Sequence, residues 1–192
     1  MWTFLHPHKT SPSTLPRSAI ASEMIKKTDL ARFVVSLLPS ALRTSSIMVH
    51  RSLVAFSTGV AAEYITRHPK IDEGAIAFVL PACIAMMESA GFPSAKDAAL
   101  AGAILLASLS HRCQLTQAAL ESILTSVTRA RDVIGETRAM QTVVSVLSPQ
   151  EQLTSLPSGV TREIIRMRFV LWHIFSVFLI LNPLQISRRY FC

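Results

Sequence analysis

Histidine and carboxylate side chains are the groups from which this sequence could build a catalytic or metal site. The six histidines include no H-E-x-x-H pair, and no two of them share an expected helix face with a carboxylate at the spacing of zinc ligands. His6 and His8 lie close together near the N-terminus, but no third ligand is near them. Glu63, Glu88 and Glu121 fall in different segments, each with neighbours typical of a solvated surface. We therefore expect no metal site.

The sequence also shows no sign of a glycine-rich phosphate-binding loop or of an activated nucleophile. The six glycines are isolated and form neither a G-x-x-x-x-G-K-[ST] nor a G-x-G-x-x-G motif, so no phosphate-binding loop is expected. Serine, cysteine and histidine are present, but nothing in the sequence places a nucleophile beside a base. We expect no catalytic residues and no cofactor, and a protein that is not an enzyme.

The three cysteines point to a reducing environment. Cys83, Cys113 and Cys192 are far apart, odd in number and contain no C-x-x-C pair, so neither a disulfide framework nor a zinc-ligand spacing is expected. Cys83 and Cys113 stand among apolar residues, which predicts that they are small buried side chains.

The composition favours a single helical unit. The chain has 192 residues, of which 50% are hydrophobic, 16% charged and 7% aromatic. This balance argues against a disordered chain, and the length excludes two large domains. Alanine and leucine with few glycines and aromatics favour helices over a sandwich of short strands.

An internal repeat organises the region from Arg51 to Arg131, which aligns with itself without a gap when shifted by 44 positions. This period is typical of paired-helix repeats of the HEAT and armadillo type, which span about 40–47 residues. The apolar pairs brought together by the shift include Phe56 with Leu100, Val60 with Ile104, Ile76 with Leu120, Val79 with Ile123 and Cys83 with Val127.

Each repeat is expected to consist of two antiparallel helices, the second of which carries an apolar stripe with i, i+3, i+4, i+7 spacing. Asp72 and Thr116 are placed to cap these second helices, and the sequence 94–97 resembles a capping box for a first helix. The segment 98–109 is apolar nearly all round, which predicts packing against neighbours on more than one side. Pro81 is expected to kink its helix.

A third unit follows at a shift near 41 residues, with Leu156 on Leu115 and Ile164 on Ile123. The sequence 148–151, Ser-Pro-Gln-Glu, predicts a helix start with Ser148 as the cap. The fold predicted from these patterns is all-α: a short α-solenoid of about three HEAT-like antiparallel helix pairs, with a disordered N-terminal leader and an extra apolar C-terminal helix.

The expected organisation has three parts. Residues 1–28 are predicted to be a disordered leader, although a basic, acid-poor segment of this kind also resembles a mitochondrial presequence. Residues 29–167 form the repeats, beginning with a short amphipathic helix from Asp29 that Pro39 is expected to end or kink. Residues 168–192 form an atypical apolar and basic tail.

The tail has three interpretations. The apolar run 169–181 spans roughly 20 Å as a helix, less than the roughly 30 Å hydrocarbon core, which favours a buried or interfacial helix. Extended to 169–186, with basic residues at both ends, the run is a candidate membrane anchor, although Asn182, Pro183 and His173 weaken it. A truncated or misassembled gene would also produce this change in composition.

The net charge of +7 lies outside the repeats. Residues 51–161 hold eight basic and nine acidic residues, so the repeat body is nearly neutral and the flanks are basic. RNA binding by a basic face of the solenoid stays open as an alternative, with contacts at the repeat connections, although ordinary solvated turns explain the same residues. These candidate contacts, for RNA or another partner, are Arg67, His68, Lys70 and Arg112.

The repeats contain a series of motifs that is specific in order and identity. They are Asp29-Leu30-Ala31-Arg32-Phe33, His50-Arg51-Ser52-Leu53-Val54-Ala55-Phe56, Glu63-Tyr64-Ile65, Ala77-Phe78-Val79-Leu80-Pro81-Ala82, Leu105-Leu106-Ala107-Ser108-Leu109-Ser110 and Ser148-Pro149-Gln150-Glu151-Gln152-Leu153. Together these motifs resemble an internal stretch of the fungal U3 small nucleolar RNA-associated protein 10 family, and the likeness covers about residues 29–167.

This resemblance implies a non-enzymatic HEAT-repeat scaffold of the nucleolar small-subunit processome, a ribonucleoprotein of the nucleus. It implies a role in pre-18S rRNA processing and ribosomal DNA transcription through contacts with other processome proteins, and an indirect association with pre-rRNA and the U3 ribonucleoprotein. Members of that family are far longer, so the chain is expected to be a fragment or a truncated gene product. An array without its neighbouring repeats is expected to expose apolar ends and to self-associate.

Overall fold

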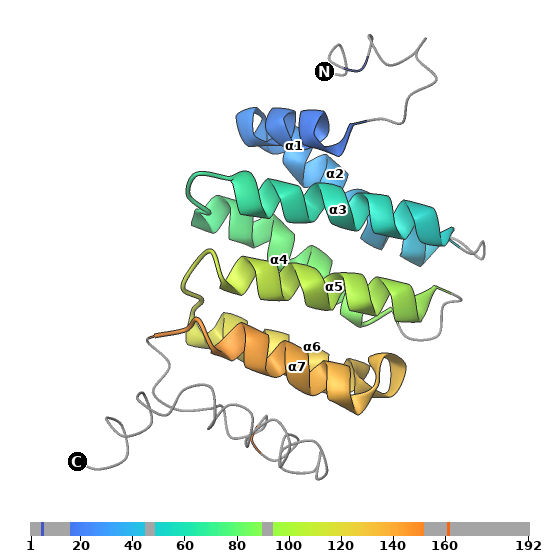
Figure 1. Cartoon of the computed structure of the whole chain (residues 1–192), viewed down its shortest axis with the longest axis vertical. Helices are drawn as coiled ribbons and strands as arrows, with labels where there is room; N and C mark the ends of the chain where they lie inside the picture. Colours follow the sequence, from blue (N-terminus) through green and yellow to red (C-terminus); the bar gives the residue numbers. More distant parts are fainter. Residues whose placement is uncertain (1–4, 6–15, 45–48, 90–93, 152–160, 162–192) are drawn as a thin grey trace.

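The protein is described by a computed structural model that places residues 5, 16–44, 49–89, 94–151 and 161. This part of the chain contains seven α-helices and no strand (Figure 1). The helices are α1 (Arg17–Lys26), α2 (Thr28–Thr44), α3 (Arg51–Arg67), α4 (Glu73–Met87), α5 (Ala95–Ser110), α6 (Gln117–Ile134) and α7 (Glu136–Leu147).

The helices pack in two layers that follow the order of the chain. In one layer α1 packs on α3, α3 on α5 and α5 on α7; in the other α2 packs on α4 and α4 on α6. Between the layers, α2 packs on α1 and α3, α4 packs on α5, and α6 packs on α5 and α7. This stacking of helix pairs confirms the all-α, solenoid-like fold predicted from the repeats.

The 44-residue register sets the positions of the central helices. The first helices, α3 and α5, begin at Arg51 and Ala95, and the second helices, α4 and α6, begin at Glu73 and Gln117. The predicted caps are confirmed: the side chain of Asp72 accepts a hydrogen bond from the backbone N–H of Ala75 at 2.7 Å, and that of Thr116 accepts one from Ala119 at 3.3 Å. Each cap satisfies an N–H that has no partner within its helix.

Helix α5 lies at the centre of the array. It packs against α3, α4, α6 and α7, and ten of its sixteen residues are buried. This confirms the prediction that the apolar segment 98–109 has neighbours on more than one side. Gly102 allows α5 to approach α4 closely, because a Cβ there would lie 2.8 Å from the carbonyl oxygen of Cys83.

The third predicted unit begins with α7. Glu136, its first residue, follows Ala95 of α5 by the predicted 41 positions, and Gly135 separates α6 from α7 with φ of 91°, a conformation that favours glycine. The second helix of this unit falls on residues outside the described part, except Thr161. The described array therefore contains three helix pairs and α7.

The additional pair arises at the N-terminus, where the prediction of a disordered leader over 1–28 is wrong for residues 17–26. These residues form α1, which packs on α2 and α3 and buries Ile20, Ala21 and Met24. Leu5 also packs against the core. Helix α1 is short and weakly amphipathic, so its stability comes from tertiary packing rather than from a local sequence signal.

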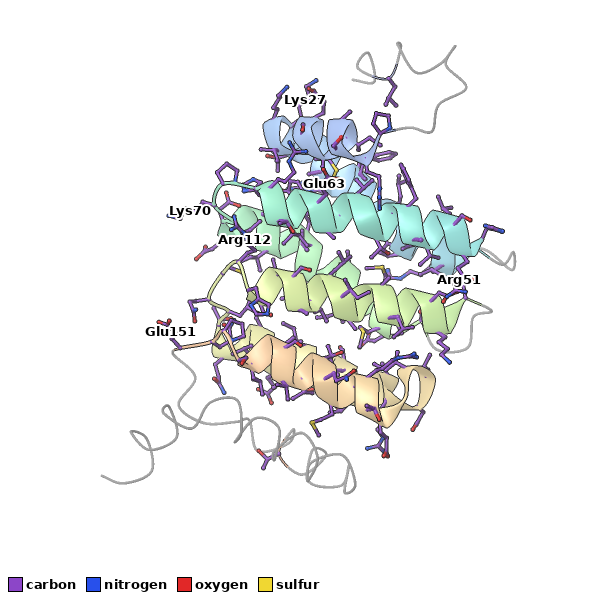
Figure 2. The ribbon with its side chains drawn as sticks, viewed as in Figure 1. Lys27, Arg51, Glu63, Lys70, Arg112 and Glu151 are labelled. Carbon is purple, nitrogen blue, oxygen red and sulfur yellow. The ribbon has the colours of Figure 1, made fainter. Side chains whose placement is uncertain are left out.

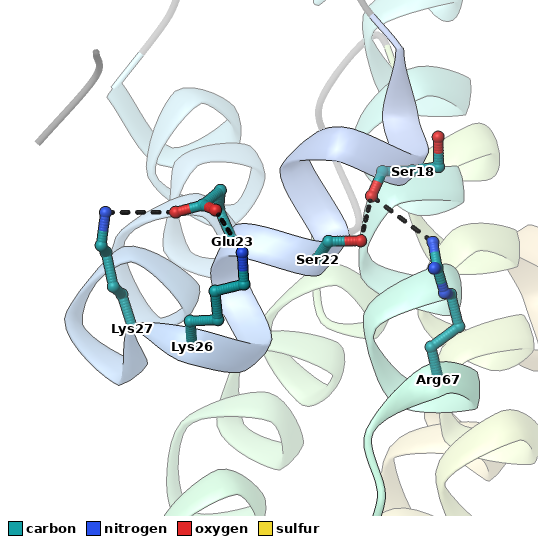
Figure 3. Close-up of polar contacts among 6 residues, drawn as sticks. All are labelled: Ser18, Ser22, Glu23, Lys26, Lys27 and Arg67. Atoms are coloured by element: carbon teal, nitrogen blue, oxygen red, sulfur yellow. Dashed lines mark hydrogen bonds and ion pairs between the residues drawn. The ribbon is translucent and has the colours of Figure 1, made fainter. Parts of the chain in front are cut away.

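The outward side of α1 is polar. Ser18 and Ser22 are linked by a hydrogen bond of 2.8 Å from the Ser22 hydroxyl to the Ser18 carbonyl, and Glu23 forms ion pairs with Lys26 at 2.9 Å and Lys27 at 3.1 Å (Figure 3). Hydrogen bonds from Lys26 and Lys27 lower the pKa of the Glu23 carboxyl. A polar outer face is typical of the terminal helix of a solenoid. Helix α2 differs, because Phe33 and Leu37 are nearly half exposed.

Three local predictions differ from the structure in part. Helix α2 does not end at Pro39 but continues to Thr44, and Pro81 lies within α4 as expected, while a kink at either proline stays a prediction. Ser94 forms no capping box, because its hydroxyl donates to the carbonyl of Val49 at 2.7 Å. Ser148 does not start a helix but follows the last residue of α7, where its N–H donates to Val144. For Ser94, a hydrogen bond to a distant segment thus replaces the local cap.

The apolar tail lies outside the described residues, so its three interpretations stay untested. Within the described part, no helix combines the length and the hydrophobicity that a bilayer crossing requires.

A candidate partner-binding edge

The predicted contact residues lie along one edge of the array, where the two helices of each unit are connected. We call residues 67–72, 111–116 and 148–151 the connection edge. The three segments lie on the same side of the molecule in Figure 1, and Lys70, Arg112 and Glu151 mark them in Figure 2. They share an edge because each first helix is followed by a short connection to an antiparallel second helix.

Arg112 and His68 are brought together by the repeat. A guanidinium nitrogen of Arg112 donates to the backbone carbonyl of His68 at 2.6 Å, across 44 positions of sequence. His68 ends α3, and its ring meets that of Tyr64 edge-on with centroids 5.3 Å apart. Its Nδ1 atom is buried without a hydrogen-bond partner in the structure. Arg112 therefore joins two successive units.

Tyr64 anchors the inner side of this contact. Its side chain is almost completely buried, with 2% exposed, and packs against Phe78 of α4 as well as His68. Burial, with a smaller contribution from the charge of Asp72, raises the pKa of the Tyr64 phenol. The phenol therefore stays neutral where it packs.

Arg67 points to the preceding unit and is separate from the Arg112 contact. Its guanidinium lies 3.0 Å from the carboxylate of Glu63 and donates to the carbonyl of Ser18 at 3.4 Å (Figure 3). Both Arg67 and Arg112 thus bind groups of the protein itself. Lys70 is exposed, and no contact with another described residue is found for its ammonium group.

Two glutamines that the sequence did not single out hold the last connection of the edge. The amide nitrogen of Gln150 donates to the carbonyls of Ser110 at 2.9 Å and Cys113 at 3.3 Å, and its amide oxygen accepts from the N–H of Leu115 at 2.8 Å. Gln114 makes the reciprocal contacts, with the carbonyl of Pro149 at 2.9 Å and the N–H of Glu151 at 3.2 Å. No spacing rule signals this pair, because the partners are 35 to 40 residues apart.

The edge is therefore a row of hydrogen bonds that join successive units. Its described charges are mixed, with Asp72, Glu73 and Glu151 beside the basic residues. In the part of the chain that the structure covers, no three histidine, cysteine or acidic side chains are grouped so as to hold a metal ion. What the edge offers a partner is a row of exposed polar side chains at repeat spacing.

The cysteines provide a direct test of the packing behind this edge. Cys83 is fully buried, which raises the pKa of its thiol to about 12, and partial burial also raises the pKa of the Cys113 thiol. Because the thiolate is the reactive form, we expect iodoacetamide at pH 8 to leave Cys83 of the folded chain unmodified and to label Cys113 more readily. Peptide mapping by mass spectrometry measures both.

The control is the same reaction in urea, which should modify both cysteines alike. Equal labelling of Cys83 in the folded and unfolded chains would contradict the predicted burial.

Since the pKa of Cys83 is raised above its unfolded value of 9.0, its contribution to stability is present below pH 9 and is lost as the pH rises towards 12.

Comparisons with protein-family models, with curated proteins and with solved structures found no match to this chain.

Proposed function

We propose that the protein is a non-enzymatic scaffold that acts in ribosome biogenesis, in pre-18S rRNA processing and ribosomal DNA transcription, through contacts with other proteins of the small-subunit processome. The observation that carries the proposal is the ordered series of motifs over residues 29–167 that resembles the U3 small nucleolar RNA-associated protein 10 family. The helical array supports it, because stacked repeats offer an extended surface for protein contacts.

The structure favours protein contacts over direct RNA binding at the connection edge. Arg67 is paired with Glu63, and Arg112 is bound to the carbonyl of His68, so two of the three cations there have partners within the fold. Neutralising phosphates requires cations that are available to the nucleic acid. The nearly neutral net charge of the repeat body also favours protein contacts over RNA binding.

Affinity purification of the tagged full chain from fungal cells tests the function. We expect nucleolar localisation, and recovery of processome proteins that persists after ribonuclease treatment, because the contacts are with proteins. The U3 small nucleolar RNA should be recovered before that treatment and lost after it. Absence of processome proteins from the purified material would refute the proposal.

A salt series separates the RNA alternative. If the edge bound RNA directly, the affinity of the purified chain for RNA would fall steeply with salt, and Lys70→Ala would reduce the slope. We expect weak binding that Lys70→Ala does not change. A steep salt dependence reduced by this substitution would instead favour the RNA-binding interpretation.

A further inference from the structure

The second-layer helices can be compared position by position because they share one register. Helices α2, α4 and α6 begin at Thr28, Glu73 and Gln117, and they run in the same direction from the connection edge (Figure 1). The guanidinium carbon of Arg32 on α2 lies 6.0 Å from the ring centroid of Phe78 on α4, which agrees with this register. Equivalent positions therefore form rows across the outer face of the layer.

Helix α4 differs from its neighbours in what it exposes. No charged side chain occurs between Glu73 and Glu88. Its outward positions form what we call the α4 face: Ala77 and Pro81, which are exposed, with Leu80, Ile84 and Ala85, which are half-buried. The face is apolar along the length of the helix.

The equivalent positions on the neighbouring helices are polar. The shift of 44 places Ala77, Pro81 and Ala85 on Glu121, Thr125 and Arg129 of α6. Helix α2 begins 45 residues before α4, and at this shift the corresponding positions of α2 are Arg32, Ser36 and Ser40. These three positions are thus apolar on α4 and polar on both neighbours, and the half-exposed Phe33 and Leu37 occupy other positions of α2. A polar rim around an apolar centre is typical of protein interfaces.

The charges on the two borders are of opposite sign in the same row. Arg32 on α2, Ala77 on α4 and Glu121 on α6 occupy equivalent positions, and all three are exposed. Near the other end of the helices the charges are mixed. Glu88 lies 3.7 Å from Arg129, and Asp132 lies 3.7 Å from Arg131, so these charges are balanced within the chain.

We propose that the α4 face binds a second copy of this chain, related by a twofold axis that runs parallel to α4. Such an axis places α4 on α4, and it places α2 of each copy against α6 of the other. Arg32 then meets Glu121 of the second copy, and the same pair forms again on the opposite border. A twofold axis perpendicular to α4 in the plane of the face would instead place α2 on α2 and α6 on α6, so Arg32 would not meet Glu121, and the charges select the parallel arrangement.

The surface is therefore self-complementary. The small side chains of Ala77 and Pro81 allow the two α4 helices to approach closely, and their apolar area leaves water on association. The two Arg32–Glu121 pairs lie at the rim, where charged pairs fix orientation and register more than affinity. This association is lateral and differs from end-to-end stacking of incomplete repeats.

Sedimentation velocity of the full chain over a wide range of concentration tests the proposal. We expect a reversible monomer–dimer equilibrium. Arg32→Glu and Glu121→Arg should each raise the dimer dissociation constant at least roughly tenfold, because like charges then meet on both borders. The double variant restores opposite charges and should recover the original constant. A chain that stays monomeric, or association that neither single substitution weakens, would overturn the proposal.

Cross-linking provides a second, independent measurement. Ala77 lies next to the twofold axis, so Ala77→Cys, in a chain that also carries Cys113→Ser and Cys192→Ser, should form a disulfide-linked dimer under mild oxidation. The matched control is Ala55→Cys, at an alanine that is also exposed but lies on α3 in the other layer. Circular dichroism checks that both variants are folded. Equal cross-linking at the two positions would show that the α4 face is not the contact.

Discussion

Replacing Gln150 with alanine is expected to lower the free energy of unfolding by about 2–4 kcal/mol, because it leaves buried backbone groups without hydrogen bonds. The Gln150 side chain is 5% exposed and serves the carbonyls of Ser110 and Cys113 and the N–H of Leu115. Truncation removes all three contacts at once. Urea unfolding followed by circular dichroism measures the loss.

Gln114→Ala is the matched control on the same edge. Its contacts with Pro149 and Glu151 are exposed, so water can replace them, and the expected loss is below about 1 kcal/mol. Hydrogen exchange should show that the Gln150 substitution weakens protection in α7 and the end of α5 first, because these elements meet there. Equal effects of the two substitutions would mean that the Gln150 contacts do not hold α7 in place.

The sequence predicts the central part of the fold well because the same pattern of apolar and capping residues occurs in two successive repeats. The apolar positions of α3 and α4 recur in α5 and α6 at 44 residues, and Asp72 and Thr116 act as caps at equivalent places. Such caps are local, since each bonds an N–H three residues ahead. Periodicity and capping together therefore locate four helices.

The ends of the array are harder to predict because their stability is not local. Helix α1 has a weak amphipathic pattern and is held by α2 and α3. Ser94 precedes the start of α5 as expected, but its hydroxyl bonds Val49, 45 residues away, instead of capping the helix, and Ser148 follows the end of α7 instead of starting a helix. A tertiary partner of this kind leaves no trace in residue spacing.

The connection edge, too, is predicted by the sequence only in part. The 44-residue alignment predicts that the repeat connections contain Arg67, His68, Lys70 and Arg112. The stacking of the units determines the partners of the two arginines: Arg112 binds the carbonyl of His68, and Arg67 binds the carbonyl of Ser18. The contacts of Gln150 depend on the position of α7 and could not be read from the sequence. The repeat therefore locates the edge, and the stacking decides which side chains remain available to a partner.

Gly102→Val is expected to destabilise the protein by about 3 kcal/mol or more, because α4 lies too close to α5 there for a side chain. A Cβ at Gly102 would lie 2.8 Å from the carbonyl oxygen of Cys83, a backbone atom that can move only if α4 moves, and 3.1 Å from Cγ of Met87. Valine adds two further methyl groups and a β-branch, which is unfavourable in a helix. Thermal and urea unfolding measure the loss.

Gly59→Ala on α3 is the control that separates this clash from the general effect of removing a helical glycine. The Cβ at Gly59 would meet the guanidinium end of Arg17, which lies 2.5 Å away but belongs to a flexible side chain that can turn aside. Alanine also favours the helix, so we expect a gain of about 0.5–1 kcal/mol. A loss of stability at Gly102 with a gain at Gly59 would show that the short α4–α5 distance excludes a larger side chain at Gly102. A stabilising Gly102→Val would mean that the two helices lie farther apart than the structure places them.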